Sequence, residues 1–167
     1  MIVLVAGLPG SGKSYFAVQL ASKMGTDYVN SDRVRKALGA WGKYAFKDKL
    51  EVYRKMVSLA ESSLMHGRVV IVDATFYLQS MRNMFISLAR QHASVIHLIV
   101  VHADEHLIKQ RLNLPRKDSE ADFEVYNQIK TEFEEFTFPH LQLESTDNNI
   151  EIMLNRASNY LESKRHE

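Results

Sequence analysis

The sequence contains no cysteine, which excludes disulfide bonds and metal sites built from thiolates. A reducing compartment is therefore expected, and we expect the protein to be cytoplasmic. No apolar run approaches about 18 residues, the length that a membrane span requires. The apolar run at residues 2–6 is also too short for the core of a signal peptide. A soluble protein is expected.

The chain has almost no net charge, +1 over 167 residues, and this argues against strong non-specific binding to nucleic acid. Basic residues are nevertheless concentrated between positions 33 and 55, where eight of them face two acidic residues. That segment is either a set of solvated helix faces or a surface that accepts an anionic substrate. No internal repeat and no linker rich in proline, glycine or serine is present, so residues 1–167 are expected to form one domain.

Short apolar runs alternate along the chain with segments of helical periodicity. This alternation is typical of a parallel sheet that is covered by helices on both faces. The expected strands are residues 2–6, 27–30, 69–73 and 95–102, with a weaker one at 141–144. Tyr126, Ile129, Phe133 and Phe136 mark one face of an expected helix. Residues 37–46 are expected to form a loop with exposed aromatic side chains.

A glycine-rich segment follows the first expected strand and precedes an amphipathic helix. Its residues are Gly7, Leu8, Pro9, Gly10, Ser11, Gly12, Lys13 and Ser14. They match the P-loop pattern G-x-x-x-x-G-K-[ST], in which backbone N–H groups converge on phosphates. We expect Lys13 to bind the β- and γ-phosphates of ATP, and Ser14 to ligate Mg²⁺. Tyr15, the next residue, is also expected to bind the nucleotide.

Ser31 and Asp32 follow the second expected strand at its carboxyl end, where ligands collect in an open α/β sheet. There Asp32 could accept the proton of an attacking hydroxyl group, and Arg35 could hold an anionic part of the acceptor. The alternative is that Ser31 or Asp32 only caps a helix over residues 33–38.

Asp73 and Thr75 end the third expected strand at the same edge. Asp73 could orient a magnesium-bound water or the substrate, and Thr75 could bond a phosphate or sugar oxygen. Ala74 stands where motor ATPases usually carry a catalytic glutamate. This favours transfer to a bound acceptor over hydrolysis.

Basic residues also surround Leu114 and Pro115, at a hinge just before an expected helix that begins with a capping box at Ser119. We interpret approximately residues 111–122 as a short helical lid. Within it, Arg111 is expected to contact the nucleotide, and Arg116 to neutralise charge on the transferring phosphoryl group. The alternative is that these are surface arginines at a helix junction.

These motifs resemble the P-loop predicted-kinase family that includes the zeta-toxin and polynucleotide-kinase relatives. The most similar members are the stand-alone ATP-binding proteins that are also found fused to aminoglycoside-phosphotransferase-like domains. The similarity is carried by GLPGSGKS, SDRVRKAL, GRVVIVDATF followed by Arg82, and RLNLPRKDSEADFEVY, which together span most of residues 2–136. The resemblance implies a three-layer P-loop NTPase fold, with five parallel strands in the order 2-3-1-4-5. It further implies that Asp32 is the general base, that Arg35 and Arg82 contact the acceptor, and that Arg116 is the lid arginine. Phe76 stands where the polynucleotide kinases carry asparagine.

The combined expectation is an ATP- and Mg²⁺-dependent phosphotransferase that moves the γ-phosphoryl group to a hydroxyl of a small molecule. Two alternatives remain open from the sequence. The acceptor could be the 5′-hydroxyl of a nucleic acid, or the chain could be a regulatory nucleotide-binding module without an acceptor.

Overall fold

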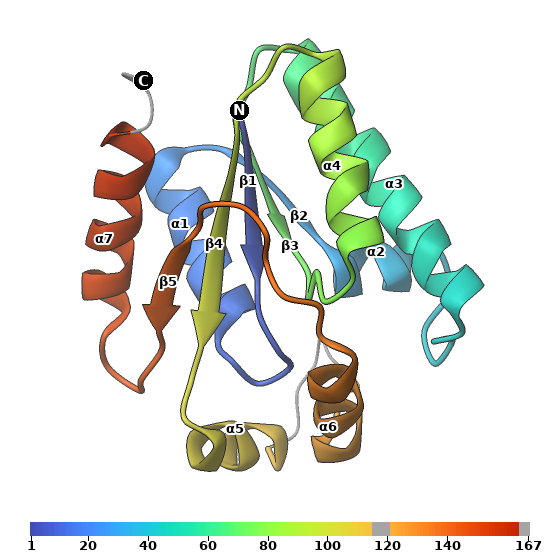
Figure 1. Cartoon of the computed structure of the whole chain (residues 1–167), viewed down its shortest axis with the longest axis vertical. Coiled ribbons are helices and arrows are strands. Elements are labelled where there is room, and N and C mark those ends of the chain that lie inside the picture. The colour runs from blue at the N-terminus through green and yellow to red at the C-terminus, as the bar shows by residue number, and fades with distance from the viewer. Residues whose placement is uncertain (115–120, 164–167) are drawn as a thin grey trace.

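The computed structural model describes residues 1–114 and 121–163, and its centre is a five-stranded sheet in the order β2-β3-β1-β4-β5 (Figure 1). The strands are β1 (Ile2–Ala6), β2 (Asp27–Asn30), β3 (Val70–Asp73), β4 (Ile96–His102) and β5 (Leu141–Glu144). Every neighbouring pair is parallel. The predicted fold and strand order are therefore confirmed, and two of the predicted strands begin one residue later than expected.

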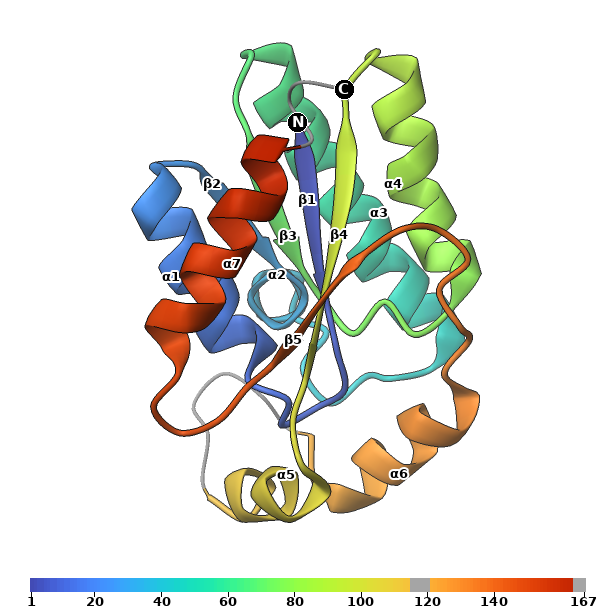
Figure 2. The same cartoon turned by 60° about the vertical axis from the view of Figure 1, so that its left-hand side comes forward.

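Helices cover both faces of the sheet (Figures 1 and 2). One face is covered by α1 (Lys13–Met24) and α7 (Ile150–Ser163), the other by α3 (Phe46–Met65) and α4 (Gln79–Gln91). Because both faces are covered, β1 is apolar at every position and completely buried. None of the described helices is long and apolar enough to cross a membrane.

The side chains of β1 alternate between two cores, as the period of a strand requires. Val3 and Val5 pack in the cluster that contains Phe16 of α1. Ile2 and Leu4 pack in the opposite cluster, which includes residues of α3 and α4. The sheet is thus packed against helices on both faces, which fixes the position of the carboxyl ends of its strands.

Three shorter helices lie at that carboxyl edge: α2 (Ser31–Ala37), α5 (Glu105–Leu112) and α6 (Phe123–Glu132). A small apolar cluster, which includes Ile108 of α5 and Tyr126 of α6, joins the last two helices below the strand ends in Figure 1. Elements that are distant in the sequence therefore meet beside the ends of the strands.

The helix predicted to run through Phe136 is shorter than expected. It ends at Glu132, and Phe133 already has an extended backbone. Phe133 and Phe136 still pack against the core, with their ring centres 5.4 Å apart, so apolar spacing alone overstated the helix. The helix begins after Asp122, whose side chain accepts a hydrogen bond from the Val125 N–H at 2.9 Å. Ser119 of the expected capping box lies outside the described residues.

Candidate active site

The glycine-rich loop connects β1 to α1, and two of its glycines are required by close approaches. A Cβ at Gly7 would lie 2.3 Å from the carbonyl oxygen of Val101, on the neighbouring strand. A Cβ at Gly12 would lie 2.6 Å from the Ser145 hydroxyl, and Gly12 has a left-handed φ of 89°. The loop therefore closes tightly against the ends of β4 and β5.

Hydrogen-bond donors around this loop are available for a ligand. Gly12 caps α1 without a side-chain hydrogen bond, so the first N–H groups of α1 have no side-chain acceptor from their cap. The Lys13 ammonium reaches only the Leu8 carbonyl, at 3.5 Å, among the hydrogen bonds of the described residues. The Ser11 hydroxyl is buried and has no hydrogen-bond partner among the residues that the structure describes. Donors at a helix N-terminus, together with a lysine, form an anion-binding arrangement.

Arg111 lies at the rim of the loop. Its Nη1 donates to the Gly10 carbonyl at 3.4 Å and to the Ser145 hydroxyl at 3.2 Å, and its Nη2 is 3.5 Å from Asp147. The end of α5 is therefore joined to the glycine-rich loop, and the nucleotide contact of Arg111 stays a prediction. Tyr15, at the start of α1, is 62% exposed. Arg116 lies outside the described residues.

Asp73 is completely buried at the end of β3, and its two carboxylate oxygens differ. Oδ2 accepts hydrogen bonds from the Tyr28 hydroxyl and the Asn30 amide, both at 2.7 Å. Oδ1 has no hydrogen-bond partner among residues 1–114 and 121–163. Burial of the ring, and then the charge of Asp73, raise the pKa of Tyr28, which keeps its hydroxyl a neutral donor. Asp73 is thus oriented by one oxygen, while the other is buried without a hydrogen-bond partner in the described chain.

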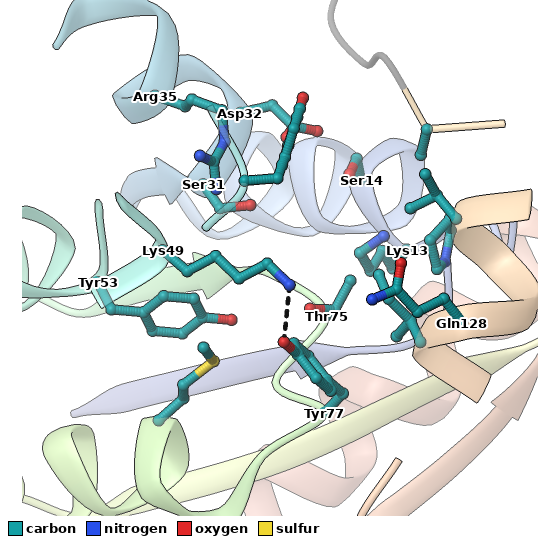
Figure 3. Close-up of a pocket in the computed structure, with 16 residues that line it drawn as sticks. Lys13, Ser14, Ser31, Asp32, Arg35, Lys49, Tyr53, Thr75, Tyr77 and Gln128 are labelled. Atoms are coloured by element: carbon teal, nitrogen blue, oxygen red, sulfur yellow. Dashed lines mark hydrogen bonds between the residues drawn. The ribbon is translucent and has the colours of Figure 1, made fainter. Parts of the chain in front are cut away.

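Asp32 lies in the first turn of α2, beside Ser31 and ahead of Arg35 (Figure 3). The helix is capped by Asn30, whose side chain accepts a hydrogen bond from the Arg33 N–H at 2.9 Å. The alternative that Ser31 or Asp32 serves only as the cap is therefore wrong. Both residues instead line a cavity.

This cavity, of about 200 Å³, lies between the glycine-rich loop and helices α2, α3, α4 and α6 (Figure 3). It is lined by Pro9, Lys13, Ser14, Ser31, Asp32, Arg35, Tyr44, Lys49, Tyr53, Thr75, Tyr77, Met81, Ala121, Val125, Gln128 and Ile129. The structure thus brings seven residues from three predicted motifs to one space: Pro9, Lys13, Ser14, Ser31, Asp32, Arg35 and Thr75. A small molecule bound there would lie beside the phosphate loop.

Four polar residues of the cavity were not identified from the sequence: Lys49, Tyr53, Tyr77 and Gln128. The Lys49 ammonium donates to the Tyr77 hydroxyl at 2.9 Å, as the dashed line in Figure 3 marks. For Lys49 the sequence carried one signal, its place in the basic segment at residues 33–55. The others belong to no motif. Tyr53 and Gln128 reach the cavity through the packing of α3 and α6, and Tyr77 reaches it from the turn after β3.

The wall after β3 is shaped by Phe76, which has a left-handed φ of 50° although it carries a large side chain. Its ring is buried edge-on against Tyr53 and Phe85, with ring centres 5.6 Å and 5.5 Å away. The Phe76 N–H donates to the Tyr53 hydroxyl at 3.3 Å. Burial raises the pKa of Tyr53, so this hydroxyl stays protonated. The turn at Phe76 presents Thr75 and Tyr77 to the cavity.

Arg82, the predicted acceptor contact, is not among the residues that line the cavity. It is completely buried, and each of its five N–H donors has an acceptor. These acceptors are the Gln79 side chain and four carbonyl groups, those of Phe76, Tyr77, Glu134 and Glu135. Burial lowers the pKa of the Arg82 guanidinium, and the charge of Glu134 opposes this effect. No donor remains for a substrate, so Arg82 joins two segments of the chain.

The family model AAA_33, described as an AAA domain, matches residues 2–136, which is most of the chain. The chain belongs to this family. The matched range contains the glycine-rich loop, Asp32 and Asp73, and it ends just past the segment that Arg82 binds. Membership agrees with the P-loop kinase resemblance that the motifs indicated.

Several solved structures share the fold over nearly the whole chain. The Mycobacterium tuberculosis APS kinase CysC in complex with AMPPNP and APS has a TM-score of 0.73 and 19% identity, covering 96% of each chain. A gluconokinase from Sinorhizobium meliloti 1021 has a TM-score of 0.69 and 16% identity, covering 97% of this chain and 95% of its own. Chaetomium thermophilum Kti12 in complex with ADP-AlF3 has a TM-score of 0.72 and 16% identity, covering 95% and 98%. At such identities the likeness shows the fold, which is that of P-loop kinases and related nucleotide-binding proteins.

Proposed function

We propose that the protein transfers the γ-phosphoryl group of ATP to a hydroxyl group of a small molecule. The observation that carries this proposal is the cavity itself, since Lys13 and Ser14 of the phosphate loop line the same space as Asp32. A phosphate site and a carboxylate beside one enclosed space are the two parts that a hydroxyl kinase needs.

In the proposed step, the acceptor oxygen forms a bond to the γ-phosphorus, while the bond from that phosphorus to the β–γ bridging oxygen breaks. ADP leaves with the electron pair of that bond. The proton of the acceptor hydroxyl passes to a carboxylate oxygen of Asp32. Lys13 holds the β- and γ-phosphates, where its charge stabilises the negative charge that develops during transfer. Arg111, already bound to the carbonyl of Gly10, contacts the nucleotide from the loop rim.

The residues present also suit magnesium, which prefers oxygen ligands and retains several waters. The Ser14 hydroxyl would ligate it, and the unpartnered Oδ1 of Asp73 would orient one of its waters. Bound with ATP, magnesium neutralises part of the phosphate charge. No group of three or more His, Cys, Asp or Glu side chains that could hold a metal by themselves occurs within residues 1–114 and 121–163. This agrees with an ion held largely by the nucleotide and water.

A small acceptor is favoured over a nucleic acid because α6 and the chain just before it contribute to the cavity wall. Ala121, Val125, Gln128 and Ile129 line the space from that side. The similar solved structures include an APS kinase and a gluconokinase, and this analogy also favours a small acceptor. The charged, hydroxyl and amide side chains among those that line the cavity favour a bound acceptor over a regulatory module that only binds nucleotide.

The test is transfer of label from γ-labelled ATP with magnesium to a panel of hydroxylated small molecules and to a 5′-hydroxyl oligonucleotide. Asp32→Asn is expected to lower kcat by about 10²–10⁴-fold while ATP affinity is retained. Lys13→Ala is expected to weaken ATP binding as well. Glu51→Gln, at an exposed acid on α3, is the matched control and should behave as wild type. Full activity of Asp32→Asn would refute the proposed base, and ATP binding without any transfer would favour the regulatory module.

A further inference from the structure

Two cationic side chains in the cavity have no part in the chemistry proposed above. The charged residues among those that line it are Lys13, Asp32, Arg35 and Lys49. Lys13 is assigned to the phosphates of ATP, and Asp32 to the proton of the acceptor. Arg35 and Lys49 remain, and a role for them in acceptor binding rests on the proposed function.

Arg35 is only 5% exposed, although its guanidinium carries a full charge. Its Nη1 donates to the Lys43 carbonyl at 2.5 Å, and its guanidinium carbon lies 4.5 Å from the centre of the Tyr44 ring. Its Nε is buried without a hydrogen-bond partner in the described chain, and no described carboxylate forms an ion pair with it. A buried charge without a counter-ion is costly, so a bound anion would relieve this arrangement.

Lys49 enters the cavity from the first turn of α3, and Figure 3 shows its ammonium directed into the space that the labelled residues surround. The hydrogen bond to Tyr77 uses one of its three donors and holds the ammonium in place. The ammonium also lies 5.1 Å from the centre of the Tyr77 ring. Within residues 1–114 and 121–163, Lys49 forms no ion pair. A second, oriented cation without a counter-ion therefore faces the same cavity.

We propose that Arg35 and Lys49 form an anion subsite, so that the acceptor is a small hydroxylated compound with one carboxylate or phosphate group. The side chains that complete the cavity wall are neutral, including Ser31, Thr75 and Gln128. A neutral sugar or nucleoside would leave both cations unpaired. A polycationic acceptor such as an aminoglycoside would be repelled by them.

The position of Asp32 limits the size of this acceptor. Asp32 and Arg35 are three residues apart on α2, a spacing at which Cβ atoms lie about 5–6 Å from each other. The hydroxyl that gives its proton to Asp32 and the anionic group held by Arg35 therefore bind beside the same helix, in a cavity of about 200 Å³. Small hydroxy acids and sugar phosphates suit this arrangement.

The first experiment uses the full chain, γ-labelled ATP with magnesium, and related acceptors in neutral and anionic forms. Glycerol is compared with glycerate and glycerol 3-phosphate, and glucose with gluconate and glucose 6-phosphate. We expect kcat/KM for an anionic member to exceed that of its neutral partner at least tenfold. The carboxylate and phosphate arms show which anion the subsite prefers. Equal transfer to neutral and anionic partners would overturn the subsite and leave the phosphotransferase proposal intact.

Variants locate the effect within the cavity. Lys49→Gln keeps the length of the side chain nearly unchanged but removes its charge, so KM for an anionic acceptor should rise about 10- to 100-fold. KM for ATP should stay within about twofold. Lys47→Gln is the matched control, because Lys47 is exposed on the first turn of the same helix. An unchanged acceptor KM in Lys49→Gln would overturn the assignment of Lys49.

Binding separates failure of the subsite from failure of the proposed function. Calorimetry is performed with a non-hydrolysable ATP analogue at saturation, using the four anionic compounds and inorganic phosphate as probes. Binding that is lost in Lys49→Gln and retained in Lys47→Gln supports the subsite even if no label is transferred, and in that case the phosphotransferase proposal fails alone. Absence of binding by all five probes would overturn the anion subsite.

Discussion

Replacing Arg82 by lysine tests whether this residue is structural or contacts the substrate. The guanidinium makes five hydrogen bonds, to Phe76, Tyr77, Gln79, Glu134 and Glu135, and the residue is completely buried. Lysine retains the charge but has three donors on a single nitrogen, so at least two acceptors lose their partner. Each buried polar group left unsatisfied costs about 1–3 kcal/mol, and Arg82→Lys should therefore lower the free energy of unfolding by about 2–6 kcal/mol.

The measurement is urea unfolding followed by circular dichroism, with Arg90→Lys as the control. Arg90 is exposed on the same helix, and its replacement should change the free energy of unfolding by less than about 0.5 kcal/mol. A loss below about 0.5 kcal/mol in Arg82→Lys would refute the structural role. A raised KM for the acceptor at unchanged stability would instead restore Arg82 as a substrate contact.

Two further predictions concern the buried aromatic cluster beside the cavity. Burial raises the pKa of Tyr53, so its contribution to stability is complete below the usual tyrosine value of about 10 and is lost as pH rises towards the folded-state pKa. Between pH 10 and 11 the wild type should therefore lose up to about 1.4 kcal/mol more than Tyr53→Phe in urea unfolding, and equal losses would contradict this. Phe76→Asn should relieve about 1 kcal/mol of left-handed strain but lose about 3–5 kcal/mol of aromatic burial, so the variant should be less stable. An increase in its urea midpoint would show that strain, not packing, dominates at this turn.

The three central strands β1, β3 and β4 could be predicted because they are largely apolar runs, and such runs arise when both faces of a strand are buried. Residues 2–6, 27–30 and 141–144 matched the observed strands completely. The strand order came from the family resemblance, since periodicity gives the elements but not their neighbours. Ends of helices were less predictable, because Phe133 and Phe136 keep the apolar spacing after the helix has ended.

The phosphate loop and Asp32 could be predicted because each motif directly follows a strand, and the ends of parallel strands meet at one edge of the sheet. The surroundings of Arg82 could not be predicted, because they depend on a segment distant in the sequence. Its spacing from Asp73 said nothing about residues 134 and 135, whose carbonyl groups bind its guanidinium only after the chain returns past α6. That Lys49 and Gln128 line the same cavity could not be predicted, because it depends on how α3 and α6 pack around that cavity.

Asn30, which no motif singled out, links two parts of the proposed site through its one side-chain amide. Its oxygen accepts from the Arg33 N–H and so caps the helix that carries Asp32. Its nitrogen donates to Oδ2 of Asp73 and so leaves the other oxygen, Oδ1, without a partner in the described chain. Aspartate could supply only the cap at this position, because an ionised carboxylate has no donor for Asp73. Asparagine can satisfy both demands, and the proposed base and the proposed magnesium-side carboxylate are therefore oriented by the same group.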